Sequence, residues 1–383
     1  MIKKYPIVAS PILLREIFKK SSFNLEENFK NIINCEYLYF LNSATTSLFL
    51  IFEALKEFSN RTEVIVPAYS ASSIIYAIKK AKLIPKLCDI SLEDFNFEID
   101  DLLNLVSSRT LCVVLVYLFG IANSKILKLK NYSLDFYIIE DCAQAFGSKV
   151  NNKFVGTNFD FGIFSFNKGK NTPTYTGGAL VLNSKDFNLV ISKKIKSFNL
   201  KTENNLISFL KILLFYLFLN PYLYGLFYPI LFKLKEITYT KDFKVAGYNL
   251  QKLKLLSYFI KNLEALSKKR YLNGKYLLEN LKSYSNIILP KISDEDEPAF
   301  NRFPIVFRDL KTLKKVEMAL ESAGFETSRM YNKPLHYEFD LGYKKNEFKN
   351  ANFLAEHLLT VPVHPLLKEK DLIRMVDIIK KNL

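Results

Sequence analysis

The residues best suited to covalent chemistry lie in the short stretch 164–171, which contains Lys168 and Lys170. A lysine between two apolar strands is unusual, because surface lysines favour the faces of helices. Partial burial lowers the pKa of a lysine and makes its amine a nucleophile for Schiff-base formation with a carbonyl group. Spacing alone does not choose between the two lysines, so the stretch predicts a nucleophilic amine with two candidates.

A second stretch, 139–145, places Asp141 and Gln144 at the end of an apolar run. An aspartate at a strand end can pair with a protonated ring nitrogen and keep a cofactor in the state of an electron sink. The same aspartate could equally be a metal ligand or a helix cap. By itself it indicates a polar site without naming the ligand.

A third stretch, 42–48, consists of small polar residues before an apolar helix that we predict over 48–55. Free N–H groups and hydroxyls at a helix N-terminus form an anion site, which suits a phosphate. The alternative is an ordinary Ser or Thr cap of the helix. Thr45 and Thr46 are the candidates for an anion site here.

Buried strands must bring these stretches together. The first half of the chain alternates β-branched runs with amphipathic stretches, which is typical of βαβ units in a mostly parallel sheet. In open α/β sheets, ligands bind at the carboxyl ends of the strands. Half of the 12 glycines lie between Gly147 and Gly178, which indicates a turn-rich site in that segment. We predict a helix over 74–81 and strands over 63–67, 84–90, 111–117 and 136–140.

The chain as a whole predicts an α/β fold in three parts. Residues 1–205 form a large cofactor-binding domain around the sheet, and 206–240 form an apolar hairpin insertion. Residues 241–383 form a smaller C-terminal α+β domain, with a strand over 302–307 and a helix over 313–323.

The predicted insertion contains an uncharged run over 212–232, which on a simple count is as long as a membrane span. Pro221, Gly225 and Pro229 interrupt it, so each piece is too short to cross a bilayer. Two alternatives stay open. The hairpin is either buried at a dimer interface or under the small domain, or it lies in the membrane interface beside anionic lipid.

The net charge of +16, from 54 basic and 38 acidic residues, fits either an anionic partner or a Lys-rich solvated surface. No nucleic-acid-binding motif accompanies it, so we expect no nucleic-acid partner. The four cysteines show no disulfide-framework spacing and the N-terminus makes a poor signal peptide, so we expect a cytoplasmic location. Three histidines without ligand spacing predict no metal site.

Taken together, the motifs resemble the DegT/DnrJ/EryC1/StrS family of sugar aminotransferases, a class of fold-type-I pyridoxal-phosphate enzymes. The resemblance runs from about residue 23 to the C-terminus, except over 206–240. Six motifs of the family have similar stretches in this chain, in the same order. They are S-G-T-A-A-L at 43–48, V-P-x-Y-T at 66–70, I-E-D-A-A-Q-A-x-G at 139–147, F-S-F-x-x-x-K-N at 164–171, P-L-H at 334–336 and L-P-L-H-P at 361–365.

The resemblance implies a role for each matching residue. It selects Lys170 as the lysine that holds pyridoxal 5'-phosphate as a Schiff base and moves the proton. Asp141 would pair with the pyridinium nitrogen, and Gln144 would lie near the phenolate oxygen. The phosphate would be bound by Ser165, Thr45 and the backbone at Thr46.

Three positions depart from the family pattern. Many relatives place an aromatic ring that stacks on the cofactor at the position of Ala71. Thr176 replaces a frequent acidic residue. A family asparagine that reaches the neighbouring subunit's phosphate has Asn249 as its nearest match, one residue out of register.

The implied activity is that of a transaminase working by ping-pong chemistry in a homodimer. Glutamate would be the amino donor and a nucleotide-linked keto-sugar the acceptor, in the biosynthesis of amino sugars or cell-surface polysaccharide. One alternative is a sugar dehydratase, against which Lys170 argues, because the family's dehydratases carry histidine there. Another is a non-catalytic, membrane-attached relative. A peripheral contact at the inner face of the membrane would run through 206–235.

Overall fold

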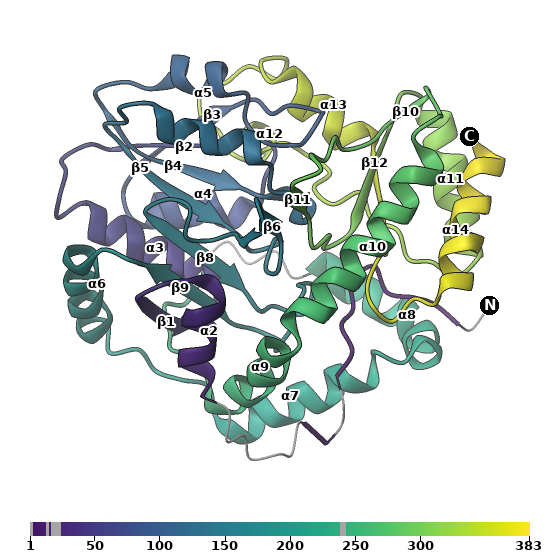
Figure 1. The fold of residues 1–383 in the computed structure, drawn as a ribbon, viewed down its shortest axis with the longest axis horizontal. Helices are drawn as coiled ribbons and strands as arrows, with labels where there is room; N and C mark the ends of the chain where they lie inside the picture. The colour runs from purple at the N-terminus through teal and green to yellow at the C-terminus, as the bar shows by residue number, and fades with distance from the viewer. Residues whose placement is uncertain (1–2, 13–14, 17–23, 238–242) are drawn as a thin grey trace.

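The fold is built around a seven-stranded sheet, which the computed structural model shows in the order β1-β9-β8-β5-β4-β2-β3 (Figure 1). The structure describes residues 3–12, 15–16, 24–237 and 243–383. Neighbouring strands from β8 to β3 are parallel, whereas β9 runs antiparallel to both β1 and β8. The strands are β1 (Tyr37–Leu41), β2 (Glu63–Pro67), β3 (Ile84–Cys88), β4 (Thr110–Val116), β5 (Tyr137–Asp141), β8 (Phe161–Ser165) and β9 (Gly178–Leu182).

The four strands predicted in the first half are confirmed as β2, β3, β4 and β5, with ends that differ by at most two residues. Every residue of β4 is buried, because helices cover both faces of a parallel sheet. The helix predicted over 48–55 begins earlier, at Ala44. The reason is a cap, in which Ser43 Oγ accepts a hydrogen bond from Thr46 N at 3.1 Å.

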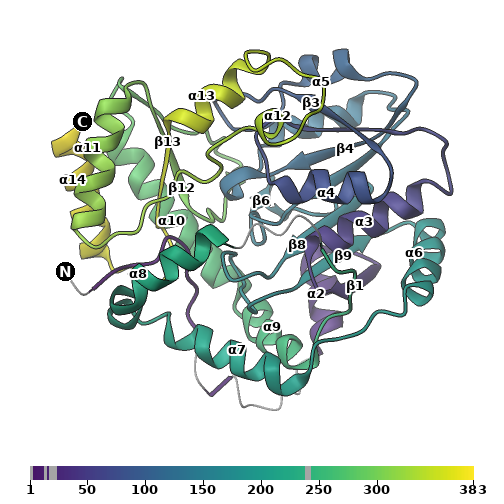
Figure 2. The same ribbon diagram turned by 180° about the vertical axis from the view of Figure 1, so that it is seen from behind.

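Helices pack on both sides of this sheet. Helix α3 contacts α4, α6 and the strands β8 and β9 (Figure 2). Helix α2 contacts α9 and β1. The helices around the large sheet are α2 (Leu25–Ile33), α3 (Ala44–Leu55), α4 (Ser72–Lys80), α5 (Ile99–Leu105), α6 (Lys185–Ser197) and α9 (Leu250–Lys261).

The C-terminal third forms a second, smaller unit around a three-stranded antiparallel sheet, β10-β12-β13. Helix α10 crosses between this unit and the large sheet (Figure 1). A third small sheet, β11-β6-β7, links the two units. The elements are β6 (Lys149–Val150), β7 (Lys153–Phe154), β10 (Ile287–Ile288), β11 (Asp296–Glu297), β12 (Phe303–Phe307), β13 (Leu358–Val361), α10 (Leu263–Leu281), α11 (Leu310–Ser322), α12 (Leu335–Glu338), α13 (Lys349–His357) and α14 (Glu369–Asn382).

The N-terminal segment 3–12 lies against the C-terminal unit. Tyr5 pairs with Phe325 in a parallel bridge, and its hydroxyl donates to Asp371 Oδ1 at 2.8 Å. Further along, Ser10 Oγ donates to the carbonyl of Asn171 at 2.5 Å. The segment therefore connects the C-terminal unit to the loop that follows Lys170. The domain limits drawn from the sequence, 1–205 and 241–383, stay a prediction.

The predicted insertion consists of two helices, α7 (Asn205–Leu217) and α8 (Pro221–Ile237), which meet at 101°. Pro221 is the first residue of α8, a position at which proline costs no hydrogen bond. The predicted interruptions at Gly225 and Pro229 are wrong, since α8 runs through both. Residues 238–240 of the predicted insertion lie outside the described residues. No single described helix is long and apolar enough to cross a membrane, although the bent pair together meets that length and composition.

Candidate active site

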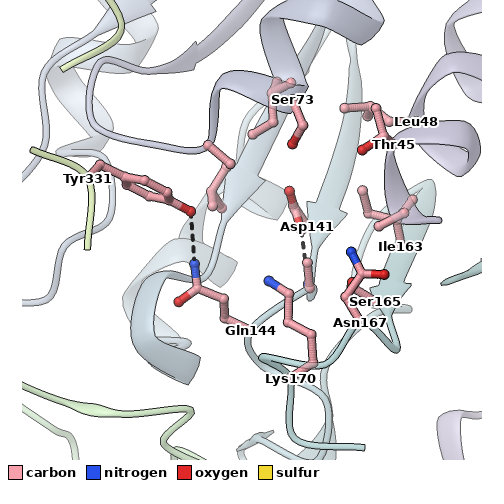
Figure 3. Close-up of a pocket in the computed structure, with 15 residues that line it drawn as sticks. Thr45, Leu48, Ser73, Asp141, Gln144, Ile163, Ser165, Asn167, Lys170 and Tyr331 are labelled. Carbon is pink, nitrogen blue, oxygen red and sulfur yellow. Dashed lines mark hydrogen bonds between the residues drawn. The ribbon is translucent and has the colours of Figure 1, made fainter. Parts of the chain in front are cut away.

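A cavity with about 570 Å³ of empty space, its open mouth included, lies where β4, β5 and β8 end. Val116, Asp141 and Ser165 are the last residues of these strands, and all three line it. Parallel strands present their carboxyl ends at one edge, which is where α/β proteins bind ligands. Lys170, Gln144 and Thr45 complete the set of predicted site residues in the wall (Figure 3).

The structure distinguishes the two candidate lysines. Lys170 lines the cavity and extends toward Asp141 and Gln144 (Figure 3). Burial lowers the pKa of Lys170 to about 8, with Arg302 acting in the same direction and the carboxylate of Asp141 against it. Lys168 is exposed and lies over the ring of Tyr175, with its Nζ 5.2 Å from the ring centroid. Only Lys170 is therefore placed to act as a nucleophile in this cavity.

A buried amide network holds the loop on both sides of Lys170. Asn301 Nδ2 donates to the carbonyl of Gly169 and to Asn171 Oδ1, both at 3.1 Å. Asn171 Nδ2 in turn donates to the carbonyl oxygens of Phe146 and Ala299, at 3.2 and 2.7 Å. Because both asparagines are buried and hydrogen-bonded, the network fixes the direction in which Lys170 leaves the backbone.

Asp141 is a buried carboxylate facing into the cavity, with 7% of its surface exposed. Its Oδ1 accepts a hydrogen bond from Ala143 N at 2.9 Å. Burial raises the pKa of Asp141, while this N–H group and the nearby Lys170 act to lower it. A carboxylate held in this way can form an ion pair with a protonated ring nitrogen of a bound ligand.

Gln144 and Tyr331 form the wall on one side of Lys170 (Figure 3). Gln144 Oε1 accepts from Phe119 N at 3.0 Å, and its Nε2 donates to the hydroxyl of Tyr331 at 3.4 Å. The Tyr69 ring packs against Tyr331, with centroids 5.4 Å apart. Sequence reasoning missed Tyr331, which follows Gln144 by 187 residues and carries no local motif.

Three hydroxyl groups also line the cavity, those of Thr45, Ser73 and Ser165, and Thr45 and Ser165 lie on the side opposite Tyr331 (Figure 3). None of them has a hydrogen bond to another described residue, and Ser165 is only 3% exposed. Thr45 also lies in the first turn of α3, whose N–H groups favour an anion. These groups fit a phosphate. Ser73 was missed because no motif marks the first turn of α4.

Thr46 has a different place from the one predicted. Its N–H donates to Ser43 Oγ, and its hydroxyl donates to Asn42 Oδ1 at 2.7 Å. The residue is buried and does not line the cavity. The Thr46 N–H group thus caps the helix in this structure, and its contact with a phosphate stays a prediction.

The donor set fits a phosphorylated pyridine aldehyde better than a metal ion. It offers an amine, a carboxylate and three unpaired hydroxyls, one of them in the first turn of α3. Among the residues that the structure describes, no group of three or more His, Cys, Asp or Glu side chains could hold a metal.

A model of the DegT/DnrJ/EryC1/StrS aminotransferase family matches residues 19–204 and 248–380. The chain belongs to this family. It is 26% identical to the uncharacterised protein MJ1066 of Methanocaldococcus jannaschii over 372 residues, which cover 94% of this chain and 89% of that protein. It is 33% identical to a GDP-perosamine synthase of Escherichia coli O157:H7 over 162 residues, which cover 42% of this chain and 44% of the synthase.

The fold agrees with solved structures of similar proteins. A putative sugar aminotransferase of Streptococcus pneumoniae, solved in its PLP form, superposes with a TM-score of 0.76 at 20% identity. The alignment covers 99% of this chain and all of that one. PseC of Helicobacter pylori, an aminotransferase involved in the biosynthesis of pseudoaminic acid, superposes with a TM-score of 0.75 at 19% identity. It covers 99% of both chains.

The positions that depart from the family pattern have clear places in the structure. Ala71 lines the cavity as the cap residue of α4. The hydroxyl of Thr176 accepts a hydrogen bond from Lys252 Nζ at 2.5 Å. Asn249 caps α9, and its Nδ2 donates to the carbonyl of Glu203 and to Asn205 Oδ1 at 2.7 and 2.9 Å. Asn249 does not line this cavity, so its contact with a partner subunit's phosphate stays a prediction.

Proposed function

We propose that this chain is a pyridoxal-phosphate-dependent aminotransferase that moves an amino group from glutamate to a nucleotide-linked keto-sugar. The product would serve the biosynthesis of amino sugars or cell-surface polysaccharide. The observation that carries the proposal is the pairing of Lys170 with Asp141 in one cavity, beside the unpaired hydroxyls of Thr45, Ser73 and Ser165. Relatives named as sugar aminotransferases and as a GDP-perosamine synthase support the substrate class.

Pyridoxal phosphate, when bound, supplies an aldehyde that accepts the amino group and a ring that takes up the electrons of the substrate. Lys170 would provide the amine that holds the aldehyde and would carry the proton at its Nζ. Asp141 would keep the ring nitrogen protonated, and Gln144 would orient the ring edge. Thr45, Ser73 and Ser165 would donate hydrogen bonds to the phosphate.

Dehydration is the competing reaction, because two relatives are named GDP-4-keto-6-deoxy-D-mannose 3-dehydratase, one of them 22% identical over 383 aligned positions. Lys170 favours transamination, since its amine could hold the cofactor's aldehyde and move the proton, whereas the dehydratases of the family carry histidine there. A non-catalytic role is disfavoured because Lys170, Asp141, Gln144 and Ser165 all line one cavity.

The test compares the two lysines. In the Lys170→Ala variant we expect loss of both the absorbance shift of bound cofactor and the activity with glutamate and nucleotide-linked keto-sugars. In the Lys168→Ala variant we expect both to remain, because Lys168 is exposed and does not line the cavity. The opposite result would show that the motif has been aligned to the wrong lysine.

We further propose that the chain forms a homodimer, as the family resemblance implies. Asn249 lies outside the cavity of its own protomer. In a homodimer it would be available to contact the phosphate bound by the neighbouring subunit. Sedimentation of the purified protein should give twice the mass of one chain, which is 44.4 kDa. A monomer that retains full activity would refute the proposal.

We also propose that α7 and α8 rest on an anionic membrane surface. The inner side of α7 packs on α9 through the buried Ile212. Its outer side is apolar as well, whereas an ordinary surface helix is polar on that side. The exposed side chains are Leu206, Ile207, Leu210, Leu214 and Leu217 on α7, and Tyr222, Leu223, Leu226 and Phe227 on α8, each between 37% and 66% exposed.

Location and charge support a lipid surface as the partner. The family match stops at residue 204 and resumes at 248, so both helices lie in a segment that the family model does not cover. The net charge of +16 favours anionic lipid. Phe215 of α7 packs against Tyr175 in the loop after Lys170, with ring centroids 6.3 Å apart. The contact would place the catalytic loop near a lipid-linked or membrane-delivered substrate.

Flotation with anionic liposomes tests this surface. The wild type should float at low salt, whereas a variant with Leu206, Leu210, Leu214 and Leu226 replaced by Gln should not. Replacing Leu272 and Met318, which are 49% and 70% exposed on α10 and α11, is the matched control and should leave flotation intact. A wild type that stays in the soluble fraction refutes the membrane contact. If the variant instead loses its dimer, the same face belongs to the subunit interface.

A further inference from the structure

Tyr175 is a half-buried residue at the base of the hairpin 166–177, which carries Lys170. Its carbonyl oxygen accepts a hydrogen bond from Lys168 N, across the hairpin, at 3.1 Å. The backbone of Tyr175 is left-handed, with a φ of 76°. A bulky residue rarely adopts this conformation, whereas a glycine would adopt it without steric cost. Backbone strain of this kind persists only where the surrounding structure holds it, and the contacts of the Tyr175 ring show what does so.

Helix α7 provides contacts on the Tyr175 ring. The Phe215 ring lies 6.3 Å from it between centroids, at an interplanar angle of 80°, and Lys211 Nζ lies 5.8 Å from its centroid. Phe215 also packs against the apolar cluster through which α7 rests on α9. The ring at the base of the hairpin is therefore held by a helix that is itself packed on the body of the protein.

An ionic connection joins the same helix to the next residue of the hairpin. Lys252 of α9 is 4% exposed, and its Nζ donates to Thr176 Oγ1 at 2.5 Å and to Glu203 Oε2 at 2.8 Å. Glu203 also accepts from Ser208 Oγ at 2.7 Å and pairs with Lys211, both on α7. Burial acts to raise the pKa of Glu203, but hydrogen bonds from Lys211 and Lys252 outweigh it and lower this pKa to about 2. The ionised carboxylate thus ties α7 to the hairpin through Lys252.

We propose that Tyr175 and Phe215 are positioning residues, through which α7 sets the place of Lys170 in the cavity. The amide network fixes the hairpin at the residues on either side of Lys170, whereas α7 fixes its base. A reacting group loses rate when it is displaced by as little as about 1 Å. The family model leaves 205–247 unmatched, so this support comes from a segment outside the family pattern. The inference rests on the proposed aminotransferase function only in the second of its two measurements.

The first measurement uses the cofactor-free protein and follows acetylation of Lys170 against pH by mass spectrometry. The wild-type midpoint should lie near pH 8, because burial lowers the pKa of this amine. In Phe215→Ala and in Tyr175→Asn the midpoint should rise toward the ordinary 10.5, since a displaced hairpin admits water to the amine. Asparagine tolerates the left-handed backbone, so Tyr175→Asn removes the ring without adding strain. Tyr175→Phe keeps the ring and should behave as wild type.

Phe218→Ala is the matched control. Phe218 ends α7, is half-buried like Phe215, and packs against Phe227 of α8 with ring centroids 5.6 Å apart. Truncating either residue should lower the urea midpoint of unfolding, but only Phe215→Ala should move the acetylation midpoint of Lys170. An equal rise in both variants would indicate a general loosening of the fold and overturn the proposal. An unchanged midpoint in Phe215→Ala would overturn it as well, as would a Tyr175→Phe variant that behaves like Tyr175→Asn.

The second measurement follows the rate at which added pyridoxal phosphate gains its bound absorbance. This rate should fall about 10- to 100-fold in Phe215→Ala and Tyr175→Asn, the cost of a small displacement of a reacting group. It should keep its wild-type value in Phe218→Ala, and an equal rate in Phe215→Ala and wild type would overturn the inference. Failure of the proposed function would appear differently, as a wild type without any absorbance shift, while the acetylation midpoints still separate the variants.

Discussion

At the scale of single residues, the site depends on two buried groups of opposite charge in one cavity. Burial alone would disfavour the charge on both Lys170 and Asp141, and each partly offsets this for the other. The result is a lysine with a pKa of about 8. An amine of this kind is available as a nucleophile near neutral pH.

The lowered pKa of Lys170 predicts how its reactivity depends on pH. In the cofactor-free protein, acetylation of Lys170 should rise with pH and level off above about pH 8, because the neutral amine is the reactive form. Mass spectrometry of the modified peptide gives the midpoint. The Asp141→Asn variant should have a still lower midpoint, since the carboxylate favours the charged amine. A midpoint near that of an ordinary lysine would contradict the burial argument.

Asp141 should act through its charge. The Asp141→Asn variant keeps the shape and the acceptor for Ala143 N. Cofactor should still bind, while turnover falls on the order of 10²-fold or more, as expected when an electrostatic contact to the reacting ring is lost. Comparing kcat with the dissociation constant of pyridoxal phosphate separates the two effects. Activity within a few-fold of the wild type would refute the role.

At the scale of elements, the anion site requires strand β9 to pass very close to the start of α3. A Cβ atom on Gly178 would lie 2.4 Å from both Ala44 N and the carbonyl carbon of Ser43. Both are backbone atoms, which cannot move aside as a flexible side chain would. The glycine pair 177–178 thus sets how near the strand and the helix N-terminus can approach.

Gly178→Ala should therefore destabilise the fold and distort the phosphate site together. We expect the free energy of unfolding to fall by about 3 kcal/mol or more, and the affinity for pyridoxal phosphate to fall with it. Gly169→Ala is the matched control in the same region, because its Cβ would meet nothing within 4 Å. Urea unfolding of the two variants should differ clearly, and equal stabilities would contradict the close-approach argument.

At the scale of the whole molecule, the N-terminal segment and the C-terminal unit meet around buried polar groups. His364 Nε2 contacts the carbonyl of Pro6 at 3.0 Å. Arg270, which is 1% exposed, donates to Ala9 O at 2.5 Å and to Ser10 Oγ at 2.8 Å. Burial lowers the pKa of His364 to about 3, and the positive charge of Arg270 acts in the same direction.

This pKa predicts a loss of stability in mild acid. Below its ordinary pKa of 6.5, His364 is protonated in the unfolded chain while it stays neutral in the folded protein down to about pH 3. Protons therefore favour unfolding across this window, and stability is fully present only above it. Between pH 7 and pH 5 the free energy of unfolding should fall by about 2 kcal/mol from this group. Urea titrations of wild type and His364→Asn test it, and equal slopes against pH would contradict the assignment.

The sequence by itself determined the strands and the principal reactive groups. Residues 63–67 and 136–140 are apolar runs that suit a sheet buried on both faces, and the structure confirms them as β2 and β5 with small shifts at the ends. Asp141 ends one such run, and Lys170 lies shortly after another. The local order of residues therefore already places both at one edge of the sheet.

Only the tertiary structure decided which other groups share the cavity. Tyr331 comes from a segment more than 130 residues beyond Lys170 and carries no local pattern, so folding alone brings it there. The hydrogen bond that uses the Thr46 N–H group, and the 101° bend between α7 and α8, likewise depend on neighbours in space. Side-chain periodicity reports burial along one element. It does not report which distant elements pack together, because that follows from the contacts the whole chain can satisfy at once.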